Sequence, residues 1–232
     1  MIRHLLQLIW NQRKQNAWLW AELLLVSVFL WFLVDYLYVM GRTYTAPLGF
    51  DIRHTYSIVI SSLSERSPDY IPKEKRERPD GVHLLTALDR IRTYPGVESA
   101  CLTDGGMPYY MGSRNLVWRI DTLQVPCRYA FVTPEFFDVF RIYDKDGKTA
   151  SLKRAIEDNN SIVISADVET MNPGLSLLGQ KAYRGNVTDE IEETIRGISV
   201  PIRRHEYTKA EPNVYRALRL SRMEEGYYEG MI

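Results

Sequence analysis

Residues 17–40 read AWLWAELLLVSVFLWFLVDYLYVM, and this stretch decides the fold. It carries two charged residues, Glu22 and Asp35, and neither lies near its middle. At 1.5 Å per residue, a helix of this length reaches about 36 Å, enough to cross a hydrocarbon core of about 30 Å. Tryptophan and tyrosine lie near both ends, where such rings favour the lipid headgroups. The stretch therefore predicts a transmembrane helix over residues 17–40.

The residues before this helix predict its orientation. Arg3, Arg13 and Lys14 precede it, and positive residues tend to stay on the cytoplasmic side. We therefore expect residues 1–16 to be cytoplasmic and residues 41–232 to lie outside, on a single-pass protein of the bacterial inner membrane. The first segment is expected to be amphipathic, with one apolar face formed by Ile2, Leu5, Leu6 and Ile9, although it could instead continue the spanning helix.

Two other readings of the apolar stretch remain open. A cleaved signal peptide has a shorter apolar region, of about 7–15 residues, that ends in a small-residue cleavage site. Here the run is longer and ends in Tyr36, Tyr38 and Met40. A buried helix of a soluble protein seldom needs this length or these aromatic ends. An uncleaved anchor is the interpretation that fits best.

Composition limits the kinds of partner. The chain has 232 residues, and its 29 basic and 29 acidic side chains give a formal net charge of zero. Nucleic acid calls for a basic face, so no nucleic-acid partner is expected. Two cysteines, Cys101 and Cys127, are too few for a disulfide scaffold. Both fall in predicted strands, which favours two buried thiols, with a single disulfide as the alternative.

The outer part mixes strand and helix patterns. Residues 55–63 (TYSIVISSL), an amphipathic helix over 82–94 and a strand over 97–102 predict a βαβ-like unit. A hairpin is expected from strands 115–121 and 125–132, and Thr133 is expected to cap a short helix with Phe136, Phe137 and Phe140 on its apolar face. The remaining predicted elements are helices at 151–157 and 166–171 and strands at 161–165, 179–183 and 194–201. The chain after Arg203 is weakly patterned. The sum is an α+β domain with a mixed sheet.

Patterns that would carry chemistry are weak. The run Gly147-Lys148-Thr149 resembles the end of a phosphate-binding loop, but Ile142 stands where that loop needs a glycine. The four histidines, His4, His54, His83 and His205, show no metal-ligand spacing. Tyr109 and Tyr110, in a glycine-rich loop, either touch a partner or pack over the sheet. We expect no catalytic, cofactor-binding or metal-binding residue, no cofactor and no enzyme activity.

Five pieces of the sequence together resemble one family. They are, in order, Gly49-Phe50-Asp51, Tyr94-Pro95-Gly96-Val97-Glu98, Val132-Thr133-Pro134-Glu135-Phe136-Phe137, Ile162-Val163-Ile164-Ser165 followed by Leu178-Gly179-Gln180, and Ile195-Arg196-Gly197-Ile198. Behind a helix with basic flanks, this order is similar to the MacB-type, FtsX-like permeases of ABC transporters, over their N-terminal helix and periplasmic core domain.

The resemblance implies a non-catalytic permease subunit that works with a separate cytoplasmic ABC ATPase. It also implies a permease homodimer or heterodimer, a possible periplasmic partner protein and contact with membrane lipid. The family couples ATP hydrolysis to its outer domain for efflux or mechanotransmission. Its members carry three more spanning helices, whereas nothing after Met40 approaches 18 apolar residues. We therefore expect a permease subunit or fragment whose outer domain is incomplete at its C-terminal end.

Two other functions stay open. A membrane-tethered extracytoplasmic sensor or binding module would need the same anchor and a folded outer domain. A tethered hydrolase ranks third, because no catalytic constellation is visible in the sequence.

Overall fold

The computed structural model describes residues 2–11, 17–59, 63–72, 75–110, 112, 114–158, 160–184 and 191–221. The chain divides into two compact units, Met1–Ala46 and Pro47–Ile232. Each unit is described by itself.

The first unit holds two helices, α1 (Ile2–Asn11) and α2 (Ala17–Thr45). Helix α2 has no buried residue, and its mean hydropathy reaches 2.2 over an 18-residue window. By length and composition it can cross a membrane. Its one polar residue amid the apolar run, Ser27, donates its hydroxyl to the Leu23 carbonyl at 2.7 Å. The side chain thus needs no partner outside the helix.

Helix α2 runs five residues beyond the predicted end at Met40. Gly41 lies within this extension, and a single helical glycine costs only about 1 kcal/mol. The helix continues to Thr45, whose hydroxyl donates back to the Gly41 carbonyl at 3.1 Å.

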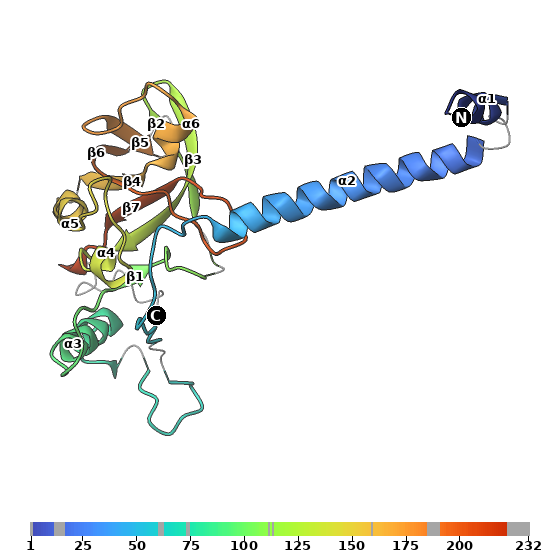
Figure 1. Cartoon of the computed structure of the whole chain (residues 1–232). Helices are drawn as coiled ribbons and strands as arrows, with labels where there is room; N and C mark the ends of the chain where they lie inside the picture. Colours follow the sequence, from blue (N-terminus) through green and yellow to red (C-terminus); the bar gives the residue numbers. More distant parts are fainter. Residues whose placement is uncertain are drawn as a thin grey trace. The chain divides into compact units, whose positions relative to one another are not determined.

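The second unit contains a seven-stranded sheet. Its strands are β1 (Thr103–Asp104), β2 (Asn115–Ile120), β3 (Leu123–Val132), β4 (Ser161–Ser165), β5 (Lys181–Arg184), β6 (Ile191–Ser199) and β7 (Asn213–Ala217). The order is β1-β3-β2-β5-β6-β4-β7, and β7 also pairs with β3 (Figure 1). That last pairing closes the six strands β2 to β7 into a ring, with β1 beside β3. The β4–β6 and β3–β7 pairs are parallel and the others antiparallel, so the predicted mixed sheet of an α+β domain is confirmed.

The ring separates two apolar cores. Every one of its six strands contributes to the inner core, which comprises Trp118, Ile120, Val125, Cys127, Ile162, Ile164, Ala182, Ile195 and Val214, with Val168 and Leu177. Val168 comes from helix α6 (Asp167–Met171). The outer core lies under α4 (Phe136–Val139) and α5 (Ala150–Glu157). Strand β4 is buried throughout because Ile162 and Ile164 face one core and Val163 faces the other.

Helix α3 (Asp80–Arg92) packs on a third, smaller apolar cluster. Its Leu84 and Leu85 contact the group formed by Leu218, Leu102, Phe131 and Leu220. The helix begins two residues before the predicted 82–94 and ends two residues earlier.

Several local predictions are confirmed. The hairpin forms with Ile120 opposite Leu123, and β4 covers the predicted 161–165. The short helices α4, α5 and α6 and the strands β5 and β6 lie close to their predicted positions. Short runs with one strong pattern, bounded by turn residues, are the easiest to place.

The predicted βαβ-like unit is wrong. Residues 55–59 form no strand, and Tyr56 and Val59 are 85% and 84% exposed, while residues 60–62 lie outside the described part. Residues 97–102 form no strand either, and β1 begins only at Thr103. Branched and aromatic residues favour a strand only where a neighbouring strand accepts them. The ring of β2 to β7 is already closed without these segments.

Two further expectations need correction. Thr133 does not cap α4: its hydroxyl accepts a hydrogen bond from the Leu102 amide at 3.2 Å, and Glu135 occupies the N-cap position. Strand β7 lies in the weakly patterned stretch after Arg203, where no strand was predicted. Its Asn213 is buried, and the Asn213 backbone N–H donates to the Ser165 hydroxyl at 2.9 Å.

Candidate functional site

The segment 48–55, here called the strap, begins three residues after the last residue of α2 and contains the Gly49-Phe50-Asp51 motif. Its backbone is tied to two parts of the sheet domain. The Arg203 amide donates to the Leu48 carbonyl at 3.0 Å, and the Asp51 amide donates to the Phe140 carbonyl at 2.9 Å. The chain is therefore fastened to the domain almost as soon as it leaves the apolar helix.

Gly49 allows this fastening. Its φ of +83° belongs to the left-handed region that L-residues avoid. A Cβ atom here would lie 2.1 Å from the Pro201 carbonyl oxygen, so the strap and residue 201 approach more closely than any side chain permits. The glycine of the motif is thus explained by packing of backbone on backbone.

Phe50 anchors the strap from its apolar side. Its ring packs against the outer core and meets the Tyr109 ring edge-on, with centroids 5.9 Å apart. Tyr109 itself has a positive φ of 61°, and its hydroxyl donates to Glu206. Tyr109 therefore packs within the domain, on the strap and not over the sheet, and its side chain remains 41% exposed.

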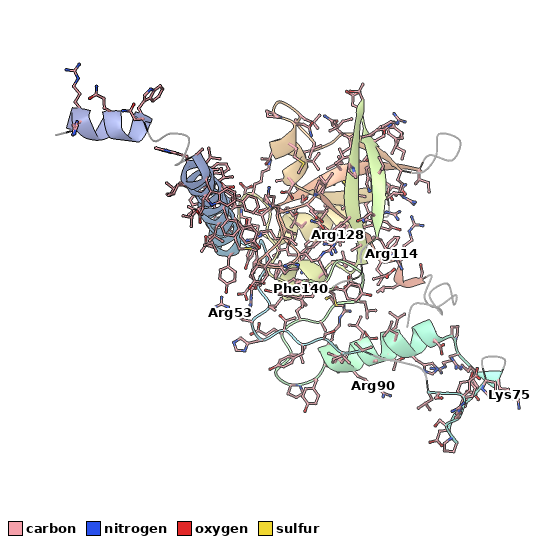
Figure 2. The ribbon with its side chains drawn as sticks, turned by 90° about the vertical axis from the view of Figure 1, so that its right-hand side faces the viewer. Arg53, Lys75, Arg90, Arg114, Arg128 and Phe140 are labelled. Carbon is pink, nitrogen blue, oxygen red and sulfur yellow. The ribbon has the colours of Figure 1, made fainter. Side chains whose placement is uncertain are left out.

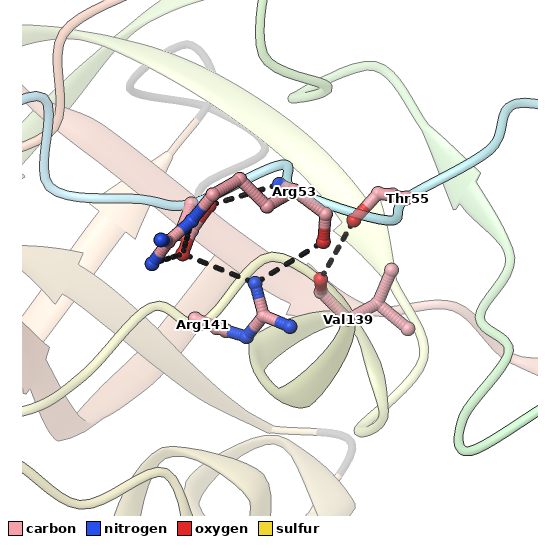
Figure 3. Close-up of polar contacts among 5 residues, drawn as sticks. Arg53, Thr55, Val139 and Arg141 are labelled. Atoms are coloured by element: carbon pink, nitrogen blue, oxygen red, sulfur yellow. Dashed lines mark hydrogen bonds and ion pairs between the residues drawn. The ribbon is translucent and has the colours of Figure 1, made fainter.

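Asp51 gathers two arginines. Its carboxylate pairs with Arg53 at 2.7 Å and with Arg141 at 3.1 Å. Arg141 also donates to the Arg53 carbonyl at 3.2 Å, and the Thr55 hydroxyl donates to the Val139 carbonyl at 3.4 Å (Figure 3). The hydrogen bonds from the Arg53 side chain and amide, with the charges of both arginines, hold the pKa of Asp51 well below its usual range. The carboxylate therefore stays ionised, and the cluster remains intact, through mildly acidic conditions.

The histidines and the Gly147-Lys148-Thr149 run, considered above as carriers of chemistry, do not come together in one site among the described residues. His54 and His83 are exposed, and among the described residues no group of three or more His, Cys, Asp or Glu could hold a metal ion. The Gly147-Lys148-Thr149 run is a turn before α5 in which the Asp144 carboxylate accepts the Lys148 and Asp146 amides at 2.8 and 2.9 Å. These amides are already bonded within the protein and do not form a phosphate cradle.

Both cysteines are free thiols, which settles the open alternative against a disulfide. Cys127 belongs to the inner core, and the half-buried Cys101 packs against the outer one. Burial raises the pKa of each thiol to about 12. Neither is poised as a nucleophile at neutral pH.

The sequence singled out the Gly49-Phe50-Asp51 motif but not the residues that contact it in the folded domain. Pro201, Arg141 and Arg203 lie far along the chain, and nothing in the local pattern links them to the strap.

A scan of the sequence against protein-family models finds no match, and a search of the curated proteins finds none either. Solved structures do resemble the chain. One is a domain of a permease protein from Porphyromonas gingivalis, with 19% identity, a TM-score of 0.45, and coverage of 63% of this chain and 55% of that one.

Two others are described as extracytoplasmic domains. The periplasmic region of MacB from Actinobacillus actinomycetemcomitans matches with 10% identity and a TM-score of 0.39, over 57% of this chain and 54% of that one. The extracellular domain of the noncanonic ABC-type transporter YknZ from Gram-positive bacteria matches with 12% identity and a TM-score of 0.41, over 61% and 65%. The chain thus spans between about half and two thirds of these solved chains.

Proposed function

We propose that this chain is a non-catalytic permease subunit, or part of one, of a MacB-type, FtsX-like ABC transporter. In this proposal residues 1–16 are cytoplasmic, residues 17–40 lie in the bacterial inner membrane and residues 41–232 form the outer core domain. A separate cytoplasmic ATPase hydrolyses ATP, and α2 carries the resulting motion to the outer domain for efflux or mechanotransmission.

The observation that carries the proposal is the strap. Only Ala46 and Pro47 separate Thr45, the last residue of α2, from Leu48, the first strap residue bonded to the domain. Three residue steps span at most about 10–11 Å at full extension. If the end of α2 moves farther than this linker can extend, it pulls on the strap. The pull then reaches the domain through the Leu48–Arg203 and Asp51–Phe140 backbone hydrogen bonds.

The closed ring of strands makes the sheet domain suited to respond as a unit to a force applied through the strap. A force applied at the Phe140 carbonyl reaches the outer core directly, because the Phe140 ring belongs to it. Close-packed cores deform little and transmit displacement. The strap joins the domain beside this core, so the domain would respond as one body.

Several partners follow from the proposal: an ABC ATPase, a second permease chain in a homodimer or heterodimer, membrane lipid around α2, and possible contact with a periplasmic protein. The alternative, a tethered extracytoplasmic sensor or binding module, shares the anchor and the lipid contact but needs no ATPase.

The test uses the full chain expressed in its host with the ABC ATPase encoded nearest to its gene. After purification of the pair in detergent, hydrogen exchange of the Leu48 to Thr55 amides is compared with and without a non-hydrolysable ATP analogue. The proposal predicts co-purification and a nucleotide-dependent change in strap exchange. The proposal is contradicted, and the sensor favoured, if the chain purifies without this ATPase or if the hydrogen exchange of the strap amides is the same with and without nucleotide.

A further inference from the structure

Three arginines gather where β3 runs beside β7. Arg114 precedes β2, and Arg128 lies in β3 opposite Asn115 on one side and Asn213 on the other. Arg114 and Arg128 line a cavity of about 10 Å³, together with Gly106, Tyr129, Asn213 and Tyr215. Figure 2 places these two arginines at the same end of the hairpin. The third, Arg204, acts on Arg128 through its charge.

Two of these three arginines, Arg128 in the cavity wall and Arg204 near it, are not balanced by an ion pair. Arg114 is paired with Asp104. Arg128 and Arg204 have no ion pair in the described part of the chain, and the Nε atom of each is buried there without a hydrogen-bond partner. The exposed Glu211 acts on Arg128 from a distance, beyond ion-pair range. A guanidinium does not lose its proton under ordinary conditions. Arg128 and Arg204 therefore remain cations, each with an Nε–H donor that has no partner in the described part of the chain.

Burial and the neighbouring charge of Arg204 both lower the pKa of Arg128. Part of this lowering comes from the charge of Arg204, so the folded chain holds the two guanidinium groups near enough to repel each other. Buried donors without a partner are rare in folded proteins and call for an explanation, such as a bound water, ion or ligand.

The wall of the cavity is built for close approach. Gly106 has a φ of +73°, and a Cβ atom there would lie 2.6 Å from the Ala130 Cβ. The glycine loop therefore lies directly on β3. Opposite it, burial raises the pKa of Tyr215, so its hydroxyl stays protonated. Burial also raises the pKa of the nearby Asp167 carboxyl.

We propose that Arg128 and Arg204 form a binding site for a small oxyanion, a phosphate or a carboxylate group. The planar guanidinium fork matches both groups and binds them by paired hydrogen bonds. The cavity has room for about one water, so one oxygen enters it.

The test measures thermal unfolding of the full chain in detergent, with sodium phosphate, sodium acetate or sodium chloride at equal ionic strength. Ligand that binds only the folded state raises the melting temperature. We expect phosphate or acetate to raise it by several degrees more than chloride does. The more effective salt identifies the oxyanion class.

Variants locate the effect. Arg128→Gln and Arg204→Gln are each expected to abolish the extra shift, and Arg90→Gln, an exposed arginine on α3, is expected to keep it. Arg128→Lys, which keeps the charge but loses the fork, is expected to weaken binding at least tenfold by calorimetry. If Arg128→Gln does not fold, Arg204→Gln decides. No oxyanion shift beyond chloride in the parent, or a shift that survives in Arg204→Gln, would overturn the proposal.

Discussion

The Asp51 amide donates to the Phe140 carbonyl at 2.9 Å, six residues after the last residue of the apolar helix. The same residue pairs its carboxylate with Arg53 and Arg141. One residue thus fastens the strap through both its backbone and its side chain, and the strap can be tested by substitutions that leave the core intact.

Replacing Gly49 with alanine should loosen the strap. The new Cβ would collide with the Pro201 carbonyl oxygen, and the positive φ adds strain of about 1–3 kcal/mol. Gly96→Ala is the matched control, since Gly96 has a φ of +91° and open space around it. Urea unfolding should show a larger loss for Gly49→Ala than for Gly96→Ala. Equal losses would mean that the close approach to Pro201 does not exist.

Asp51→Asn should weaken the strap equally at every pH well above the ordinary aspartate pKa of 3.8. The arginines lower the pKa of Asp51, so its ionised form stabilises the fold at every pH above the ordinary aspartate value of 3.8. That contribution is lost only as the pH falls below this value, toward the lowered pKa of the folded state. The difference in urea midpoint between parent and variant should therefore stay constant from pH 7 to pH 5. A difference that fades within this range would contradict the lowered pKa of Asp51, and no difference at any pH would show that the pairs do not form.

Phe137→Ala should destabilise the sheet domain by about 3–5 kcal/mol, because the ring is fully buried in the outer core. Tyr94→Ala provides the control, with a ring that is 69% exposed and an expected change within about 0.5 kcal/mol. Chemical unfolding of the full chain in detergent measures both. Similar midpoints for the two variants would remove Phe137 from the core.

Leu30→Arg should impair membrane insertion, at a cost of about 2.5–3.5 kcal/mol near the centre of a spanning helix. Leu178→Arg places the same charge on an exposed side chain of the sheet domain and should insert normally. Recovery in the membrane fraction distinguishes them. Equal recovery would argue against a spanning α2.

The two thiols should resist alkylation in the folded protein. Burial raises the pKa of Cys101 and Cys127 to about 12, so at pH 8 almost no thiolate is present. Iodoacetamide should label neither residue quickly at pH 8 until denaturant is added, and half-buried Cys101 should react first. Rapid labelling of Cys127 in the native state would contradict its place in the inner core.

The elements with one clear pattern could be predicted from the sequence. The apolar run of α2, the β2–β3 hairpin and the β-branched run of β4 each carry their own signal. Strand β7 does not, because Asn213 and Arg216 interrupt a five-residue strand whose burial comes from strands far away in the sequence. The reverse error occurred at residues 55–59, where a strand-like composition has no strand to pair with.

The strap was only half predictable. The Gly49-Phe50-Asp51 motif stands out after the helix, but its partners come from residues about 90 and 150 positions later in the chain. Backbone contacts over such separations leave no periodicity. The arginine pair at Arg128 and Arg204 is hidden in the same way, since each lies in an ordinary polar context in the sequence.

The most direct test of the account is the side of the membrane on which the sheet domain lies. In a variant with Cys101 and Cys127 replaced by alanine, Arg90→Cys puts one exposed thiol on α3. A membrane-impermeant maleimide should label it in spheroplasts, and should label it in inverted inner-membrane vesicles only after detergent is added. Labelling of inverted vesicles without detergent, or recovery of the intact protein in the aqueous fraction, would contradict the account.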